Sequence, residues 1–277
     1  MGTNETILYN GVRMPWIGLG VWTEAREDAT EAIKFAIKNG YRSIDTASAY
    51  ANEEQVGRAV KESEIKREDI FIATKVANTD QGYESTLKAF EKSLELLKMD
   101  YIDLYLIHWP IEGKSLETWK ALETLYKEKK VRAIGVSNFQ INHLEELMNQ
   151  ADVKPMVNQV EYHPNLTRPE LREYCIKHGI QMEAWSPLMR GQLNEHEVLK
   201  EIALKYKKSV AQVILRWNIQ GNVVTIPKSF NEKRIIENWL IFDFELTDKE
   251  MEVIFALNQD KHLPPPDLSK FRNNIKN

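Results

Sequence analysis

Short apolar runs and amphipathic stretches alternate along almost the whole chain. The apolar runs have the length of strands and cover Ile17–Gly20, Ser43–Asp45, Ile70–Lys75, Ile102–His108, Ala133–Ser137, Met156–Gln159, Gln181–Trp185 and Val223–Pro227. The stretches between them place apolar residues at helical spacing, as in Ala29–Asn39 and Thr86–Leu97. Strand candidates that are apolar rather than alternating are typical of parallel strands covered on both faces. The pattern therefore predicts about eight consecutive strand–helix units.

This repeat predicts an α/β protein built as one (β/α)8 TIM barrel. Eight units of this kind need roughly 250 residues, and the chain has 277. An open doubly wound sheet is the structural alternative, because it is assembled from the same units. No Gly/Ser-rich linker or low-complexity block divides the chain, so we expect residues 1–277 to form a single domain.

Segments outside the repeat extend the predicted barrel at both ends. Thr6–Met14 carries apolar residues around Asn10-Gly11, a pair typical of a tight turn, which predicts an N-terminal β-hairpin able to plug the bottom of the barrel. Thr247 and Glu250 form a capping-box pattern at the start of a late helix. Extra helices near the C-terminus are predicted over Glu195–Tyr206, Val210–Ile219 and Thr247–Leu257, and one of the first two is an insertion before the eighth strand.

Charge and composition argue against several classes of partner. The net charge of −4 provides no field that would attract nucleic acid or an anionic membrane surface. No apolar run approaches the 18 or more residues that a membrane span needs. The single cysteine, Cys175, excludes an internal disulfide and suits a reducing cytoplasm, where we expect it to be a small buried hydrophobe. No long apolar seam demands a dimer, so we expect a monomer that binds a small molecule.

Four polar residues follow or end the predicted strands at one rim of the barrel. Asp45, Lys75 and His108 each end a strand, and Tyr50 lies in the loop after Asp45. Active sites of such barrels lie at this rim. Taken singly, Asp45 could cap a turn, while Tyr50 and His108 could be core residues. A buried Lys75 is harder to explain structurally, because it needs a partner or a lowered pKa. The convergence of all four predicts an active site.

The four residue types suit the protonation of an oxygen that gains negative charge. A tyrosine hydroxyl with an ordinary pKa near 10 is a weak acid at neutral pH. A neighbouring lysine cation favours the phenolate and so lowers that pKa, while a carboxylate keeps the lysine charged and oriented. A histidine can hold a carbonyl oxygen by a hydrogen bond or share the proton. This is the chemistry that a carbonyl requires when it accepts a hydride.

A hydride must come from a cofactor, yet the chain has no dinucleotide-binding fingerprint. Gly18-Leu19-Gly20 lacks the third glycine, and no helix begins directly after it. We interpret it as a tight turn at a strand end. A Rossmann-type cofactor site is therefore not predicted.

Spread motifs give the chain a specific resemblance to a known family. They are Gly-Tyr-Arg-Ser-Ile-Asp-Thr-Ala at 40–47 with Tyr50, Leu-Tyr-Leu-Ile-His-Trp-Pro at 104–110, Ile-Gly-Val-Ser-Asn-Phe at 134–139 and Ile-Pro-Lys-Ser at 226–229. In this order they resemble the bacterial-type members of the aldo-keto reductase superfamily over nearly the whole chain. The resemblance implies NADPH-dependent reduction of aldehydes and ketones to alcohols, with hydride transfer from the nicotinamide. It also implies a catalytic tetrad of Asp45, Tyr50, Lys75 and His108, with Tyr50 as general acid.

The resemblance also implies where NADPH or NADP+ binds. Ser137, Asn138 and Gln159 match positions that hold the nicotinamide carboxamide, and Trp185 matches the aromatic residue that stacks on its ring. The loop along the pyrophosphate contains Ser186 and Leu188, and the adenosine end contains Lys228, Ser229, Arg234 and Asn238. The residue types at the adenosine end also fit this role, because two cations and a hydroxyl at a helix start suit a 2′-phosphate. Without the other motifs, a solvated basic helix start would explain them equally well.

Substrate recognition is where the chain departs from the family pattern. Many relatives have an aromatic residue two positions after the catalytic lysine, where this chain has Ala77. Trp22 and Trp109 remain as expected aromatic walls of the substrate pocket. We therefore predict a wide apolar opening that accepts bulky ketones alongside small aldehydes. The short, proline-rich tail from Pro264 onward carries no pattern that identifies a substrate.

Two other functions use some of the same residues. A Schiff-base aldolase would use Lys75 as nucleophile, but it would leave Asp45, Tyr50 and His108 unexplained. A non-catalytic NADPH-binding barrel that acts as a sensor or structural subunit is the other alternative, although an intact tetrad argues against it. Borohydride trapping and an NADPH-oxidation assay distinguish the three functions.

Overall fold

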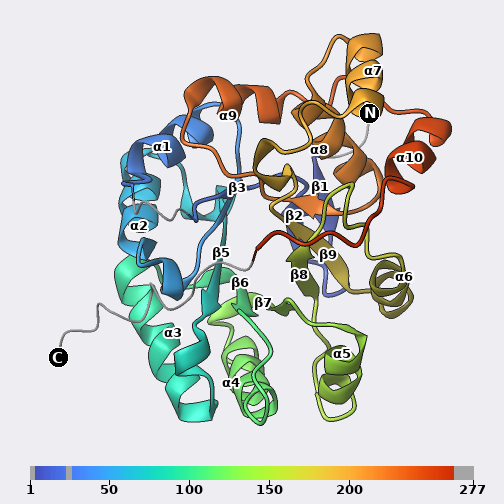
Figure 1. Ribbon diagram of the computed structural model, residues 1–277. Coiled ribbons are helices and arrows are strands. Elements are labelled where there is room, and N and C mark those ends of the chain that lie inside the picture. Colours follow the sequence, from blue (N-terminus) through green and yellow to red (C-terminus); the bar gives the residue numbers. More distant parts are fainter. Residues whose placement is uncertain (1–3, 23–26, 265–277) are drawn as a thin grey trace.

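The computed structural model, which describes residues 4–22 and 27–264, contains a closed barrel of eight parallel strands (Figure 1). The strands pair in chain order from β3 to β10, as each βα unit packs beside the one before it. Parallel bridges join Ile17 to Thr225 and Gly20 to Lys228, so the first strand meets the last. Closure excludes the open doubly wound sheet and confirms the predicted barrel.

The barrel strands lie close to the predicted ranges. They are β3 Leu19–Gly20, β4 Ser43–Asp45, β5 Phe71–Val76, β6 Ile102–Ile107, β7 Val131–Ser137, β8 Val157–Glu161, β9 Gln181–Trp185 and β10 Val224–Thr225. Two of them match the prediction at both ends, and the others shift by one or two residues. Hydrogen bonding decides these ends, and apolar patterning does not specify them.

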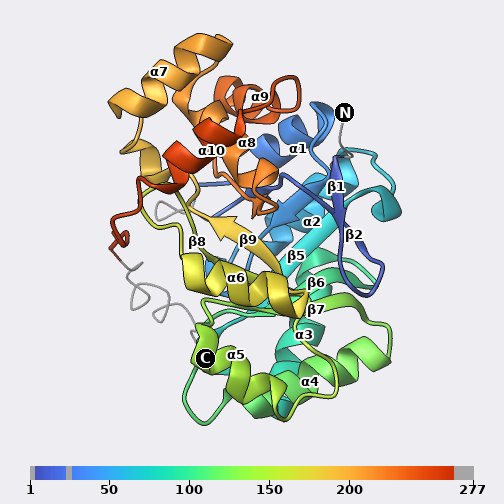
Figure 2. The same cartoon turned by 90° about the vertical axis from the view of Figure 1, so that its right-hand side faces the viewer.

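Helices surround the barrel on its outer side, as Figures 1 and 2 show. They are α1 Thr30–Lys38, α2 Glu53–Glu62, α3 Tyr83–Leu97, α4 Ser115–Lys127, α5 Ile141–Met148, α6 Pro169–His178, α7 Glu197–Tyr206, α8 Val210–Gln220, α9 Glu232–Trp239 and α10 Asp248–Phe255. Because α8 packs on β10 and α7 packs on α8 and α10, α7 is the inserted helix. The predicted capping box is present, with Thr247 and Glu250 bonding each other's backbone N–H at the start of α10.

The N-terminal hairpin confirms the sequence prediction. Strands β1 Glu5–Ile7 and β2 Arg13–Pro15 pair antiparallel, with Gly11 in the turn at a φ of +87° that favours glycine. Its side chains contact the first residues of two barrel strands: Asn10 donates to the Arg132 carbonyl of β7, and Thr6 donates to the Gln181 side chain of β9. The hairpin therefore covers the N-terminal end of the barrel, opposite the predicted site.

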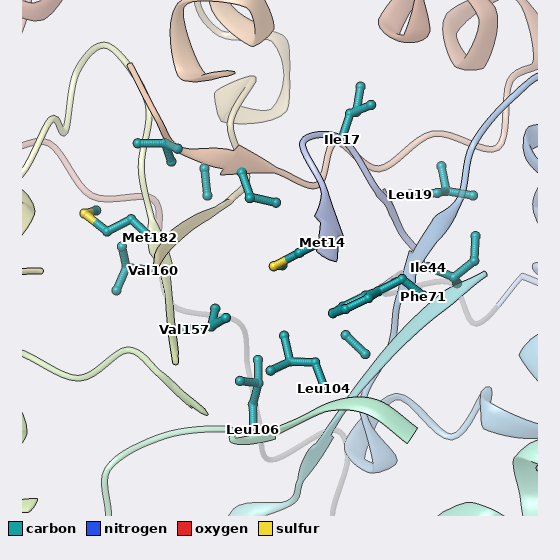
Figure 3. Packing of buried hydrophobic residues seen from close by; sticks show 14 of the residues in the cluster. Met14, Ile17, Leu19, Ile44, Phe71, Leu104, Leu106, Val157, Val160 and Met182 are labelled. Atoms are coloured by element: carbon teal, nitrogen blue, oxygen red, sulfur yellow. The ribbon is translucent and has the colours of Figure 1, made fainter. Parts of the chain in front are cut away.

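Strand parity divides the barrel interior into an apolar layer and a polar layer. Met14 of the hairpin is fully buried and lies among Phe71, Leu104 and Val157 in Figure 3. Residues of the same parity further along these strands face the same interior, because successive side chains alternate between faces. Lys75 lies an even number of positions after Phe71 on β5, and Gln159 lies an even number of positions after Val157 on β8. Both side chains therefore face the barrel interior. Apolar packing below thus supports a rigid polar layer at the C-terminal ends of the strands.

Candidate active site

A buried ion pair lies at the centre of the polar layer. The ammonium group of Lys75 donates to Asp45 Oδ1 at 2.7 Å and to the Thr46 carbonyl at 2.9 Å. Neither the Lys75 nor the Asp45 side chain is more than 4% exposed. The ammonium also lies 5.3 Å from the centre of the Tyr50 ring, which the short 3₁₀ helix η1 (Ser48–Tyr50) places over the barrel. The fold therefore brings three of the predicted four residues together.

His108 completes the group from the end of β6. Its ring meets that of Tyr50 edge to face, with the ring centres 5.6 Å apart. Burial, together with the Lys75 charge, lowers the pKa of His108 to about 3. The imidazole is thus neutral at physiological pH, so it suits a hydrogen-bonding role and not that of a proton source.

The electrostatics of Tyr50 differ from the sequence-based expectation of a lowered pKa. Burial raises the pKa of the phenol, the Lys75 cation opposes this effect, and the Asp45 charge adds to it. Burial outweighs the lysine, so the pKa ends above its ordinary value. Sequence reasoning identified the role of the cation but had no measure of the desolvation.

The charge state of Lys75 bears on the aldolase alternative. Burial lowers the pKa of Lys75, but the charges of Asp45 and Tyr50 more than offset it, so the pKa lies above its usual value. The side chain is therefore an ammonium ion at neutral pH. A Schiff-base enzyme needs the free amine as nucleophile, and this arrangement suppresses it.

The residues expected to face a nicotinamide form one hydrogen-bonded network across β7, β8 and β9. Asn138 donates to the His108 carbonyl and to Ser137 Oγ, and its Oδ1 accepts from Trp185 Nε1 at 2.8 Å. Ser137 Oγ donates to the Gln159 carbonyl. Asn138 has a φ of +65°, in the left-handed region that asparagine tolerates better than most residues. These side chains are held in place by protein groups, with no ligand required.

Two neighbouring cavities open above this layer. The central cavity, of about 120 Å³, lies over the tetrad and is lined by Gly20, Trp22, Asp45, Ala49, Tyr50, His108, Trp109, Ser137, Asn138, Gln159, Trp185, Ser186, Arg190, Ile226, Lys228 and Pro264. An outer groove of about 1040 Å³ shares Trp22, Ser186, Arg190 and Lys228 with it. The two spaces therefore lie side by side, one over the tetrad and the other at the start of α9.

The outer groove carries basic side chains at the positions that the sequence assigns to the adenosine end of the cofactor. Ser186, Leu188, Lys228, Ser229, Arg234 and Asn238 all line it. Asn231 caps α9 by accepting from the Arg234 backbone N–H, and the Lys228 ammonium lies 4.3 Å from the centre of the Phe230 ring. Among the described residues, neither Lys228 nor Arg234 pairs with a carboxylate. Both cations are therefore available to an anionic ligand.

Two of the three residues predicted for the substrate pocket line the central cavity. Trp22 and Trp109 line the central cavity as predicted, and Pro264 is a further lining residue. Ala77 lines neither cavity; its backbone N–H donates to Ser48 Oγ, beside the turn that carries Tyr50. The tail beyond Pro264 lies outside the described residues.

Sequence analysis missed Glu183 and Arg190. Glu183 is 1% exposed and accepts from Gln159 within the polar layer. A charged residue inside a predicted buried strand, two positions before Trp185, was the available signal. Arg190 lines both cavities, with its guanidinium 5.5 Å from the centre of the Trp22 ring. It lies in the short 3₁₀ helix η4 (Met189–Gly191) with a φ of +54°, and so short an element gives no periodic signal.

The fold and site define a barrel enzyme with a buried Lys–Asp pair, a tyrosine and a neutral histidine beside a long basic groove. The family model of the Aldo/keto reductase family matches residues 16–259. The chain belongs to the aldo/keto reductase family. The expected enzyme class, an NADP(H)-dependent oxidoreductase, is thereby confirmed. No helix among residues 4–22 and 27–264 has the length and apolar character that crossing a membrane requires.

Relatives of the chain include proteins named for different carbonyl and peroxide substrates. The glyoxal reductase of Bacillus subtilis (strain 168) is 64% identical over 259 residues, covering 93% of this chain and 94% of the relative. The 9,11-endoperoxide prostaglandin H2 reductase of Trypanosoma cruzi (strain CL Brener) is 54% identical, covering 94% and 93%. A solved structure of a Gox0644 mutant in complex with NADPH is 42% identical, with a TM-score of 0.91 and coverage of 97% and 98%.

Proposed function

We propose that the chain reduces small aldehydes and ketones to alcohols with NADPH, and that Tyr50 donates the proton. The observation that carries the proposal is the buried Lys75–Asp45 pair, whose ammonium lies near the Tyr50 ring beneath a cavity that adjoins a basic groove. The neutral state of His108 and the ammonium state of Lys75 both agree with it.

The residues present fit NADPH. The groove volume of about 1040 Å³ suits a ligand of that size. Lys228, Ser229 and Arg234 would hold the 2′-phosphate, with Asn238 beside them. Ser186 and Leu188 would line the pyrophosphate. Trp185 would stack on the nicotinamide, and Ser137, Asn138 and Gln159 would hold its carboxamide. Bound NADPH would supply the hydride to the carbonyl carbon.

The chain's own residues then orient and protonate the carbonyl oxygen of the substrate. Neutral His108 orients the carbonyl by a hydrogen bond while Tyr50 keeps its proton, as its raised pKa requires. As the oxygen gains negative charge it becomes far more basic than a phenolate, and the Tyr50 proton moves to it. Lys75 stabilises the phenolate that remains, and Asp45 holds the ammonium in place.

The aromatic walls of the central cavity favour a short substrate. Trp22, Tyr50 and Trp109 line the cavity, which must also hold the nicotinamide, so the space left beside Tyr50 suits a small carbonyl compound. The 64% identical relative is named a glyoxal reductase. We therefore propose short dicarbonyl aldehydes such as glyoxal as the substrate class. In the direct assay, purified protein consumes NADPH when glyoxal is added; protein that binds NADPH but turns over no aldehyde or ketone would instead support the sensor alternative.

Position 77 provides a test of the substrate pocket. Ala77 follows β5 directly, and its backbone is attached to the turn that carries Tyr50. A tryptophan introduced there is expected to add an apolar wall near the cavity mouth. In Ala77→Trp, kcat/KM for glyoxal divided by kcat/KM for a bulky aromatic ketone should rise. The factor should correspond to a free-energy difference of about 1–3 kcal/mol. If this ratio equals that of the wild type within error, residue 77 does not contribute to the pocket wall.

A further inference from the structure

Glu183 is a buried carboxyl group that the proposed mechanism does not use. It lies in β9 directly opposite Gln159 of β8 in the strand register. Its Oε2 accepts from Gln159 Nε2 at 2.8 Å, and the same nitrogen donates to Asp45 Oδ2, also at 2.8 Å. One amide group therefore links the tetrad carboxylate to a second carboxyl group.

This link determines how Gln159 faces the central cavity. A side-chain amide has two N–H donors, and the carboxyl groups of Asp45 and Glu183 accept both. Rotating the amide by a half turn would direct its oxygen at the Asp45 carboxylate, which can only accept, and this is unfavourable. Gln159 Oε1 is consequently the atom left to accept from a ligand, and no described residue donates to it.

The charges around Glu183 do not balance when it is ionised. Asp45 on β4 and Lys75 on β5 form an ion pair, and the lysine makes no bond to Glu183. On the other side, β10 places Val224 and Thr225, which carry no charge, beside β9. Burial, followed by the Asp45 charge, raises the pKa of Glu183 to about 8, with Gln159 and Lys75 opposing. The resting enzyme thus keeps Glu183 protonated at neutral pH.

We propose that Glu183 is a positioning residue that fixes Gln159, and that its proton is retained beside NADPH and released to solvent beside NADP+. This proposal rests on the proposed function, because it needs the nicotinamide to lie in the central cavity. The oxidised ring carries a positive charge that the reduced ring lacks. A nearby positive charge favours the carboxylate over the acid, so binding of the oxidised cofactor draws the proton off Glu183.

The sign of the pH dependence follows from this linkage. Well below pH 8, Glu183 is protonated with either cofactor, and the ratio of the two dissociation constants is constant. As pH rises, Glu183 ionises first in the NADP+ complex, so NADP+ gains affinity relative to NADPH. A pKa difference of about half a unit to one unit between the complexes gives a gain of about three- to tenfold. His108 titrates below this window, and Tyr50 and Lys75 titrate above it.

The experiment measures the dissociation constants of NADP+ and NADPH by isothermal titration calorimetry from about pH 6.5 to about pH 9.5. Both cofactors carry the 2′-phosphate, so its ionisation cancels in the ratio. Glu183→Gln keeps an acceptor for Gln159 but cannot ionise, and its ratio should be independent of pH. Glu53→Gln is the matched control, because Glu53 is another buried glutamate with a raised pKa that bonds Thr74 and lies outside the cavity.

The proposal is supported if the ratio changes about three- to tenfold in the wild type and in Glu53→Gln, and is flat in Glu183→Gln. It is overturned if both cofactors bind but the wild-type ratio is flat, or if Glu183→Gln retains the change. Failure of both cofactors to bind would remove the proposed function as well. Should Glu183→Gln not fold, calorimetry of the wild type in buffers of different ionisation enthalpy counts the protons directly: near pH 8, NADP+ binding must release more protons than NADPH binding.

Discussion

Replacing Tyr50 with phenylalanine is expected to lower kcat for carbonyl reduction by about 10²–10⁴-fold, the range for a lost general acid. The substitution removes one hydroxyl group and leaves the ring that faces Lys75 and His108. The fold and the affinity for NADPH should therefore be unchanged. Steady-state kinetics with glyoxal, together with a fluorescence titration of NADPH, measure the two effects separately.

Tyr83→Phe is the matched control for this substitution. The Tyr83 hydroxyl interacts with Thr124 on the outer helices, and the residue lines neither cavity. We expect it to retain wild-type kcat. If Tyr50→Phe kept more than about a tenth of the wild-type kcat, another group would have to be the proton donor.

Replacing Arg234 with alanine is expected to weaken NADPH binding by about ten- to a hundredfold and to leave NADH binding almost unchanged. A charge-assisted contact with a phosphate contributes about 1.5–3 kcal/mol, and only NADPH carries the 2′-phosphate. Arg234 lines the outer groove and pairs with no carboxylate among the described residues. Dissociation constants for both cofactors, measured for both proteins, give the result.

The neighbouring lysine controls for the general loss of a positive charge. Lys233 is exposed on the same helix but does not line the groove. Lys233→Ala should therefore bind NADPH nearly as the wild type does. Equal losses of NADPH and NADH affinity in Arg234→Ala would show that the arginine supports the local structure and does not bind the 2′-phosphate.

The barrel was predictable because its signal is repeated. Eight apolar runs at regular spacing, each followed by a helical stretch, leave few architectures open. The tetrad was predictable for a related reason, since strand ends of a barrel converge on one rim. Asp45, Lys75 and His108 could therefore be grouped before any distance was known. Strand ends were less certain by a residue or two, because backbone hydrogen bonds determine them.

What the sequence did not reveal depends on burial and on contacts between distant segments. The net pKa of Tyr50 reflects a competition between desolvation and the Lys75 charge, which no motif encodes. Glu183 becomes a candidate only when the strand register places it beside Gln159. The central cavity is closed by residues that are far apart in the sequence, among them Trp22, Trp109 and Pro264, and no local motif shows that they meet.

Transfer of deuterium from labelled cofactor to product tests the central claim most directly. The wild-type protein is incubated with glyoxal and NADPH that carries two deuterium atoms at the transferring carbon of the nicotinamide, and the alcohol product is analysed by mass spectrometry. If the chain catalyses hydride transfer in this cavity, the product contains one deuterium bound to the former carbonyl carbon, in proportion to the NADPH consumed. An unlabelled alcohol, or loss of NADPH without any alcohol, would contradict the account.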